Sequence, residues 1–288
     1  MIPSLPRSAL ERWSVASYVA AFFAFLFLPL VVVAVFAFND ANYPAPPWRG
    51  FTLDWFIGAP GRGRIGLFAD HALMSSIWTS VVVAAWVTML AVAVGTVNAF
   101  LLERARFRGK AALSLAMLAP LVIPGVILGI SVLAFASRLA TFADDVFGLE
   151  LDFLRPGLPL VVAGQFSFIV SIATLTIAAR LKRFDVALEE AAQNLGATRG
   201  AVLRTITLPY LRPALLGAGA IAFLMSFENF NTTLMLAGSD PPLTIMMYGR
   251  MREGASPVLN AVSLFLMVAS ALLALTLLRR GTRGAAAA

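Results

Sequence analysis

The sequence predicts an all-α integral membrane protein with six transmembrane helices. Hydrophobic residues make up 60% of the 288 positions and charged residues only 13%, a composition that a water-soluble domain of this size does not tolerate on its surface. The apolar residues gather in runs of about 20 residues, the length that a helix needs to cross about 30 Å of hydrocarbon. The expected spans are 17–38, 74–102, 111–136, 158–179, 214–237 and 258–278.

Composition also excludes several kinds of site. The chain has no cysteine and a single histidine, His71, so neither a zinc site nor a histidine-based catalytic triad can be assembled within it. Gly109-Lys110 lacks the earlier glycine and the following hydroxyl residue of a phosphate-binding loop. The net charge of +7 comes from basic residues that flank apolar runs, which favours a membrane over nucleic acid as partner. We therefore expect no metal, cofactor or catalysis in this chain, and energy must come from a partner or an ion gradient.

The first span, 17–38, is expected to be an uncleaved anchor. It follows Arg7 and Arg12 but is longer than the apolar core of a usual signal peptide. Residues 39–73 are rich in proline, glycine and aromatic residues, and are expected to form an ordered extracytoplasmic loop with interfacial anchoring.

The third span, 111–136, is a candidate pore-lining element because it contains Pro120, Pro124 and Gly125. Interruptions of this kind are tolerated inside a span where neighbouring helices or a water-filled cavity satisfy the freed backbone groups. An ordinary kinked packing helix is the alternative. An acidic outer loop, 138–157, follows.

The distribution of charge orients the spans. If both termini lie on the cytoplasmic side, the inner segments carry fifteen of the 22 Lys and Arg residues and the outer segments carry seven. The acidic residues run the other way, five inside and nine outside, with Glu228 within a span. This agrees with the positive-inside rule, so the N-terminal segment 1–16, the central loop 180–213 and the tail 279–288 are expected in the cytoplasm.

The polar stretch between the fourth and fifth spans predicts two short helices. Asp185 can cap a helix over 186–194, and Gly196 can supply the left-handed residue that ends it. Thr198 can cap a second short helix, which Pro209 limits. Two short helices joined at a glycine form a compact knob suited to transmitting force between proteins. A solvated cytoplasmic hairpin is the alternative.

The spacing within this loop matches a known motif. Glu190-Ala191-Ala192, three residues, Gly196, nine residues and then Ile206-x-Leu208-Pro209 resembles the EAA loop of bacterial ABC-importer permeases. The resemblance implies the fold of a type I ABC importer permease, in which the loop is a coupling helix that docks into a cleft on a cytoplasmic ATPase. The residues implied in coupling are Glu189, Glu190, Ala191, Ala192, Gly196, Ala197, Thr198, Arg199, Leu208 and Pro209.

The fifth span contains an unusual polar cluster. A carboxylate within the membrane costs at least about 2.5 to 3.5 kcal/mol, so Glu228 is a candidate functional residue by default. At helical spacing Glu228 shares a face with Asn231 and Thr232, so the three can line one pathway. Alternatively, the carboxylate pairs with an arginine and the other side chains only hydrogen-bond neighbouring helices. The candidate residues of a substrate path or gate are Ser226, Phe227, Glu228, Asn229, Asn231 and Thr232.

From Glu189 to about Leu278 the chain resembles the second permease subunit of spermidine/putrescine-type ABC importers. The matching residues include the coupling loop, Ser226-Phe227-Glu228-Asn229 and Gly254-Ala255-Ser256-Pro257. The resemblance implies a location in the bacterial inner membrane. It also implies four partners: a second permease subunit, a dimer of ATPase subunits that bind ATP and Mg²⁺, an extracytoplasmic solute-binding protein and the lipid bilayer, with no nucleic acid.

One departure from the family leaves the solute open. Polyamine-type relatives tend to have two adjacent aspartates where this chain has Glu228-Asn229. A single carboxylate would hold a dication less tightly, so a monocation, a zwitterion, an aminophosphonate, an opine, thiamine or iron are alternatives to a polyamine. A gradient-driven secondary transporter or channel is a further alternative, although it leaves the spacing of the central loop unexplained.

Overall fold

The computed structural model describes residues 9–254 and 256–285, with side chains as far as residue 272. The described part of the chain is helical, with two isolated β-bridges and no strand. The expected segments 1–16 and 279–288 lie partly outside the described residues. The chain divides into two compact units, one of Met1–His71 with Arg250–Ala269 and the other of Ala72–Gly249 with Ser270–Ala288.

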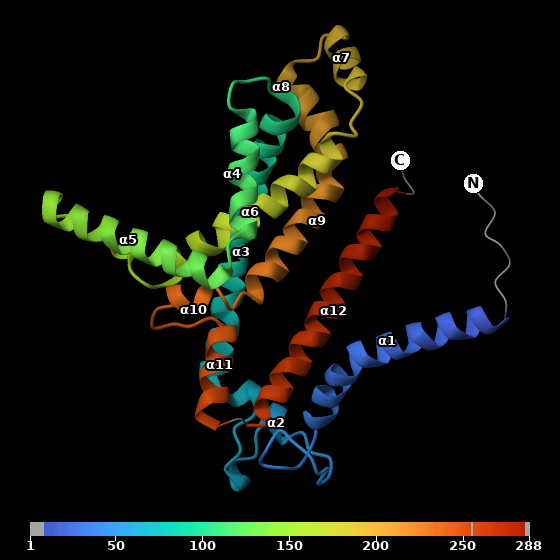
Figure 1. The fold of residues 1–288 in the computed structure, drawn as a ribbon, viewed down its shortest axis with the longest axis vertical. Helices are drawn as coiled ribbons and strands as arrows, with labels where there is room; N and C mark the ends of the chain where they lie inside the picture. Colours follow the sequence, from blue (N-terminus) through green and yellow to red (C-terminus); the bar gives the residue numbers. More distant parts are fainter. Residues whose placement is uncertain (1–8, 255, 286–288) are drawn as a thin grey trace. The chain divides into compact units, whose positions relative to one another are not determined.

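The larger unit is built around three helices that share one apolar core. These are α3 (His71–Arg104), α6 (Leu158–Leu181) and α9 (Leu208–Phe227), and α4 (Lys110–Val122) packs against α6 (Figure 1). Small residues allow the helices to approach closely, since a Cβ added at Gly95 of α3 would lie 3.1 Å from the side chain of Ala173 in α6. The buried centre of this core includes Val83, Val87, Ala91, Ile169, Ala173, Ile177 and Ala218.

Five of the described helices are long and apolar enough to cross a membrane. The first begins eight residues before the expected span, because the helical segment extends past the apolar run into Ala9–Ala16. The last helix, α12 (Val258–Ala285), is apolar over Val258–Leu272, and its side chains beyond residue 272 lie outside the described part. The five are α1 (Ala9–Phe36), α3, α5 (Gly125–Phe147), α6 and the continuous helical run Arg199–Phe227.

The segment after α1, in the smaller unit, is ordered by a buried asparagine. The Asn39 side chain accepts a hydrogen bond from the Arg49 backbone N–H at 2.7 Å and donates one to the Pro47 carbonyl at 3.2 Å. The Trp55 indole N–H donates to the Asn39 carbonyl at 2.9 Å. Three short helices complete the segment: α2 (Asp54–Ile57), η1 (Pro60–Arg62) and η2 (Leu67–Ala69).

Ion pairs reinforce this segment. Arg64 contacts Asp40 and Asp54, the latter at 3.0 Å, and its guanidinium lies 4.7 Å from the centre of the Trp55 ring. The hydrogen bond from Arg64 holds the pKa of the Asp40 carboxyl below its usual value. In the same unit, Arg250 from α11 (Leu243–Gly254) makes a two-point contact with Asp70, at 2.6 and 3.0 Å.

The expected third span, 111–136, is divided between two helices. Helix α4 ends at Val122, and α5 begins at Gly125 and turns away from α4 (Figure 1). Ile123 has an extended backbone because a residue before proline avoids the helical conformation. The break therefore falls at the expected residues Pro124 and Gly125, but it separates two helices instead of kinking one.

The prediction of a continuous fifth span over 214–237 is wrong. Helix α9 ends at Phe227, Glu228 is its C-cap, and the four-residue α10 (Thr233–Leu236) follows an irregular segment, 228–232. The Asn229 side chain explains the interruption: its Oδ1 accepts the Thr233 backbone N–H at 3.2 Å, which a helix would give to the Asn229 carbonyl. Glu228, Asn231 and Thr232 therefore do not share a helical face.

The prediction that Pro209 limits a second short helix is also wrong. Helix α8 (Arg199–Val202) continues through a π-helical turn, η4 (Leu203–Thr207), directly into α9. In a regular α-helix the ring of Pro209 would clash with the carbonyl four residues earlier. The wider π turn in front of the proline makes room for the ring, so the helix passes through this position without a break.

Candidate functional site

The central loop forms a short first helix and a turn at Gly196, as predicted, whereas its second helical segment continues into α9. Residues 185–202 are called the knob below. The first helix is α7 (Ala187–Asn194), and the Asp185 carboxylate accepts the Ala187 backbone N–H at 3.0 Å. Gly196 has a φ of +91°, which confirms its left-handed conformation. The Thr198 hydroxyl accepts the Ala201 N–H at 3.3 Å and so caps α8. The functional role of these residues remains a prediction.

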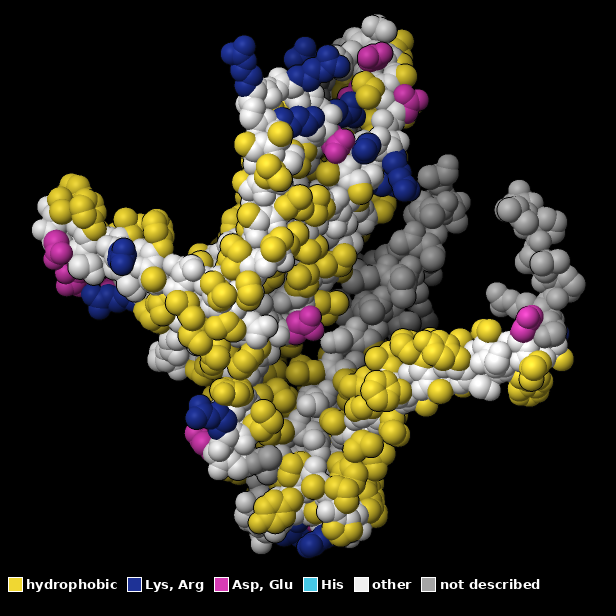
Figure 2. Space-filling view, in the orientation of Figure 1, with side chains coloured by type: hydrophobic (Ala, Val, Ile, Leu, Met, Phe, Trp, Pro, Cys, Tyr) yellow, Lys and Arg dark blue, Asp and Glu magenta, His cyan; other side chains and the backbone are white. Residues whose placement is uncertain are grey.

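Most of the knob is exposed and carries apolar side chains. None of the residues of α7 is buried, and Leu195 is 90% exposed. Glu190 is exposed and makes no side-chain hydrogen bond within the described part of the chain. Exposed apolar residues on a polar knob are typical of an interaction surface. Lys and Arg side chains also gather at the end of the larger unit that carries α7 and α8 (Figure 2).

Glu189 differs from the rest of the knob because it is tied to the bundle. Its Oε1 accepts a hydrogen bond from the Thr207 hydroxyl at 2.6 Å and lies 3.4 Å from Nη2 of Arg104. Farther along, Leu208 is half-buried and Pro209 is exposed. Among the expected coupling residues, the side chains of Glu190 and Pro209 are therefore exposed, whereas the Glu189 side chain contacts other residues of the same chain.

A buried polar network fixes the break between α9 and α10. Gln165 of α6 is 1% exposed; its side-chain oxygen accepts the Ser226 hydroxyl, and its Nε2 donates to Oγ1 of Thr233 at 2.8 Å. The Thr233 hydroxyl in turn donates to Oδ1 of Asn229 at 2.9 Å. The structure thus brings together Ser226 and Asn229 from the predicted path, and adds Gln165, which the sequence analysis missed.

The two helix breaks lie against each other. A Cβ added at Gly125 would lie 3.0 Å from the Asn231 Cβ, and one at Gly129 would lie 2.8 Å from the Thr232 carbonyl oxygen. The Thr232 hydroxyl is buried and has no hydrogen-bond partner within the described residues. The predicted pore-lining residue Gly125 therefore packs against Asn231 of the predicted path, whereas Pro120 lies within α4.

Glu228 and Asn231 lie at the exposed edge of this break. The helix rises by about 22 Å from Arg212 to Phe227. If Arg212 lies at the surface of a hydrocarbon layer about 30 Å thick, Glu228 therefore lies inside that layer. Phe227 itself is half-buried and stacks on Phe223 with ring centres 6.0 Å apart. A carboxylate facing lipid at this depth is costly, so protein or water must cover this face.

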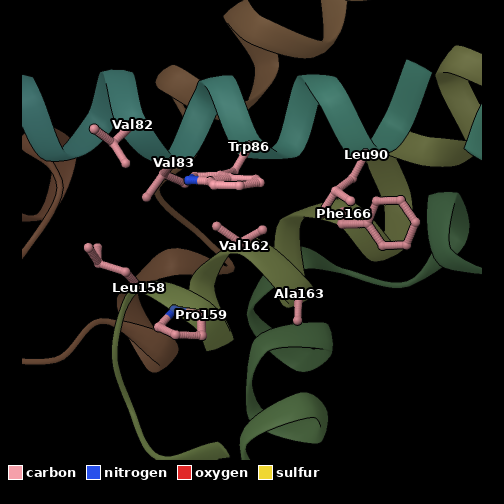
Figure 3. Close-up of a pocket in the computed structure, with 9 residues that line it drawn as sticks. All are labelled: Val82, Val83, Trp86, Leu90, Leu158, Pro159, Val162, Ala163 and Phe166. Carbon is pink, nitrogen blue, oxygen red and sulfur yellow. The ribbon is translucent and has the colours of Figure 1, made fainter. Parts of the chain in front are cut away.

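A concave surface between α3 and α6 is lined by uncharged, apolar side chains. It is a groove of about 490 Å³ into which Trp86 and Phe166 project (Figure 3). With no charged side chain it offers nothing to balance a cation. Its lining is Val82, Val83, Trp86, Leu90, Leu158, Pro159, Val162, Ala163 and Phe166.

Among residues 9–254 and 256–285, no group of three His, Asp or Glu side chains lies close enough together to hold a metal ion.

Apolar helices that break around a polar network, together with an exposed knob on a basic end, define a membrane transport subunit. The chain belongs to the family of binding-protein-dependent transport system inner membrane components, whose model matches residues 91–283. It is therefore a permease subunit of an ABC importer, a transport component and not an enzyme.

Two curated relatives cover most of the chain. The putrescine transport system permease protein PotI of Escherichia coli K12 is 30% identical over 247 residues, 85% of this chain and 82% of PotI. The spermidine/putrescine transport system permease protein PotC of the same strain is 27% identical over 254 residues, 88% of each chain.

Solved structures agree with the fold. A chain of a bacterial ABC transporter that imports alginate has a TM-score of 0.76 at 19% identity, covering 95% of both chains. A chain of the MetNI methionine ABC transporter has a TM-score of 0.55 at 16% identity, covering 74% of this chain and 95% of its own. These likenesses support the type I importer fold.

Proposed function

We propose that this permease imports a small organic cation of the polyamine class along a path that passes Glu228 and Asn231. The observation that carries the proposal is an exposed carboxylate, Glu228, at a helix break within the membrane-spanning part. A carboxylate there attracts a cation and repels an anion. The similarity to the putrescine permease PotI and the spermidine/putrescine permease PotC supports the same class of solute.

The path is formed with a second permease subunit. The exposed edge at Glu228 and Asn231 cannot face lipid without a large cost, so a second permease that covers it would enclose a polar passage between the two chains. The irregular backbone of 228–232 fits this arrangement, because non-helical backbone at membrane depth is tolerated only in protein or beside water.

The exposed knob is the docking element for a pair of ATPase subunits, which would bind the ATP and Mg²⁺. Its apolar side chains Leu188 and Leu195 are 53% and 90% exposed, and offer an area that a protein partner can bury. The basic end of the larger unit, seen in Figure 2, favours a cytoplasmic position for the knob by the positive-inside rule. Both termini would then also be cytoplasmic.

On the other side of the membrane, an extracytoplasmic binding protein would deliver the solute. The family consists of binding-protein-dependent transport components, and one structural neighbour was solved in complex with an alginate-bound periplasmic protein. A gradient-driven carrier would need neither this protein nor an ATPase.

The experiment that tests the proposal measures ATP-driven uptake of labelled putrescine and spermidine into proteoliposomes holding the whole importer. We expect Glu228→Gln to lower uptake on the order of tenfold, the effect of losing about 1.4 kcal/mol of attraction for the cation. The matched control is Glu150→Gln, which neutralises an exposed carboxylate in the loop after α5 and should leave uptake unchanged. Wild-type uptake by Glu228→Gln would remove Glu228 from the path. Uptake of a monoamine in preference to both polyamines would show that the solute is a monocation and not a polyamine.

A further inference from the structure

We infer that Glu189 is a positioning residue that locks the coupling helix α7 to the ends of α3 and α9, while its neighbour Glu190 is left free to meet the ATPase. The inference rests on the proposed coupling role of the central loop. Of two adjacent glutamates, Glu189 would hold α7 to other helices of this chain, and Glu190 would contact the partner protein.

The first observation is that one carboxylate oxygen of Glu189 receives two donors from distant parts of the chain. Thr207, 1% exposed and the last residue of the π turn, donates at 2.6 Å. Arg104, the last residue of α3, lies at 3.4 Å. The side chains of Arg104 and Glu189 are only 25% and 20% exposed, so water competes little for this contact. Glu190, one residue along α7, is exposed.

The second observation is that the lock continues into the helix bundle. The Arg104 guanidinium lies 5.4 Å from the centre of the Phe184 ring, and Phe184 meets Tyr210 edge to face at 5.0 Å. Arg180, near the end of α6, lies 4.2 Å from the centre of the Tyr210 ring. Phe184 is buried, so this chain of contacts is part of the packed interior.

A displacement of α7 would therefore be carried to three membrane helices through Glu189. None of the residues of α7 is buried, and its Glu189 side chain is the one that bonds to Thr207 and Arg104. Without the Glu189 contacts, α7 could move against its neighbours while still holding the ATPase. ATP would then be hydrolysed with little transport.

The test compares single and double variants in the complete importer. Glu189→Gln keeps an acceptor for Thr207 but loses the charge that pairs with Arg104, and Thr207→Val removes the hydroxyl at nearly constant shape. Each should lower the solute imported per ATP hydrolysed about fivefold or more. If both residues act through one shared contact, the Glu189→Gln/Thr207→Val double variant should be no worse than the worse single variant. Its loss would then be smaller than the product of the two single losses, a non-additive result.

Two matched controls accompany these variants. Thr205→Val removes a hydroxyl from the same π turn that binds only the Ala201 carbonyl of its own helix, and should leave the ratio unchanged. Glu190→Gln should instead weaken co-purification of the ATPase. The inference is wrong if Glu189→Gln also loses the ATPase during purification. It is also wrong if Thr207→Val and Thr205→Val give the same amount of solute imported per ATP hydrolysed.

The mobility of a spin label tests the contacts of Glu189 independently of the proposed function. Because the chain has no cysteine, Leu195→Cys gives a single site for a spin label on an exposed position beside α7. We expect the label to become more mobile when Glu189→Gln is added, and unchanged label mobility would overturn the lock. If instead no ATPase accompanies the wild-type chain, the proposed function fails whatever the label reports.

Discussion

Gly129 of α5 lies so close to Thr232 that a Cβ on the glycine would stand 2.8 Å from the threonine carbonyl oxygen. The contact joins the start of α5 to the irregular segment that interrupts α9 and α10. Two interruptions more than 100 residues apart in the sequence are thus packed into one site. Backbone, not a flexible side chain, stands opposite the glycine, so the contact cannot adjust cheaply.

We expect Gly129→Ala to destabilise the protein by about 1 to 3 kcal/mol, because the added methyl group must displace backbone in a packed region. Thermal unfolding of the purified protein in detergent measures the change. Gly217→Ala on α9 is the matched control: no heavy atom lies within 4 Å of its added Cβ. This control should be neutral or stabilising by up to about 1 kcal/mol. Equal changes in stability for the two variants would show that the backbone near Gly129 can move to accept a methyl group.

A second prediction concerns the buried amide of Gln165. Gln165→Leu leaves the buried Ser226 hydroxyl without its acceptor and removes the donor to Thr233, whose hydroxyl keeps Asn229, and should cost about 1 to 3 kcal/mol of stability. Solute uptake should fall as well, since the network fixes the break beside Glu228. Ser167→Ala on the same helix removes a hydroxyl that binds only the Gly164 carbonyl of its own helix, and should change little. Full uptake by a stable Gln165→Leu protein would contradict a role for the network in the path.

A third prediction separates coupling from folding at Gly196. Its φ of +91° disfavours any side chain, but an added Cβ meets nothing within 4 Å. Gly196→Asp should therefore strain only the turn after α7, by about 1 to 2 kcal/mol, and leave the protein in the membrane. Uptake should nevertheless be lost. Gly200→Asp adds the same charge at an ordinary helical position of the same loop and should retain most uptake. Loss of membrane insertion by Gly196→Asp would argue against a role confined to coupling.

The fourth prediction is a pH effect in the segment after α1. The hydrogen bond and charge of Arg64 lower the pKa of Asp40, so the folded state favours the ionised carboxyl more than the unfolded state does. This contribution is complete above the usual aspartate pKa and is lost as pH falls through the lowered value in the folded protein. The melting temperature of the wild type should therefore fall more steeply below about pH 4 than that of Asp40→Asn. Parallel curves for the two proteins would show that the pair does not contribute.

Local features of the candidate site could be predicted from the sequence. Asp185, Gly196 and Thr198 act through residues two or three positions away, so capping and turn chemistry reveal them. Pro124 likewise marks a break because proline restricts its own neighbour. The apolar runs were also sufficient to identify a helical membrane protein.

Contacts between distant segments could not be predicted. Gln165 stands in an apolar helix without any motif, and its partners lie 61 and 68 residues away. The end of α9 and the start of α10 could not be predicted because periodicity extends a helix through residues 228–232. The Asn229 side chain instead captures the backbone donor that the helix needs. Arg104 and Glu189 are 85 residues apart, and only the fold pairs them.

The measurement that tests the central claim most directly is purification of this chain from its native host in mild detergent, with mass spectrometry of the accompanying proteins. A permease subunit of an ATP-driven importer should bring with it an ATPase and a second permease in stable proportion. The Gly196→Asp variant serves as the internal comparison and should still bring the second permease with it, because the change lies in the central loop and not among the spans. Recovery of the wild-type chain alone, repeatedly and in several detergents, would contradict the account and favour a gradient-driven carrier or channel.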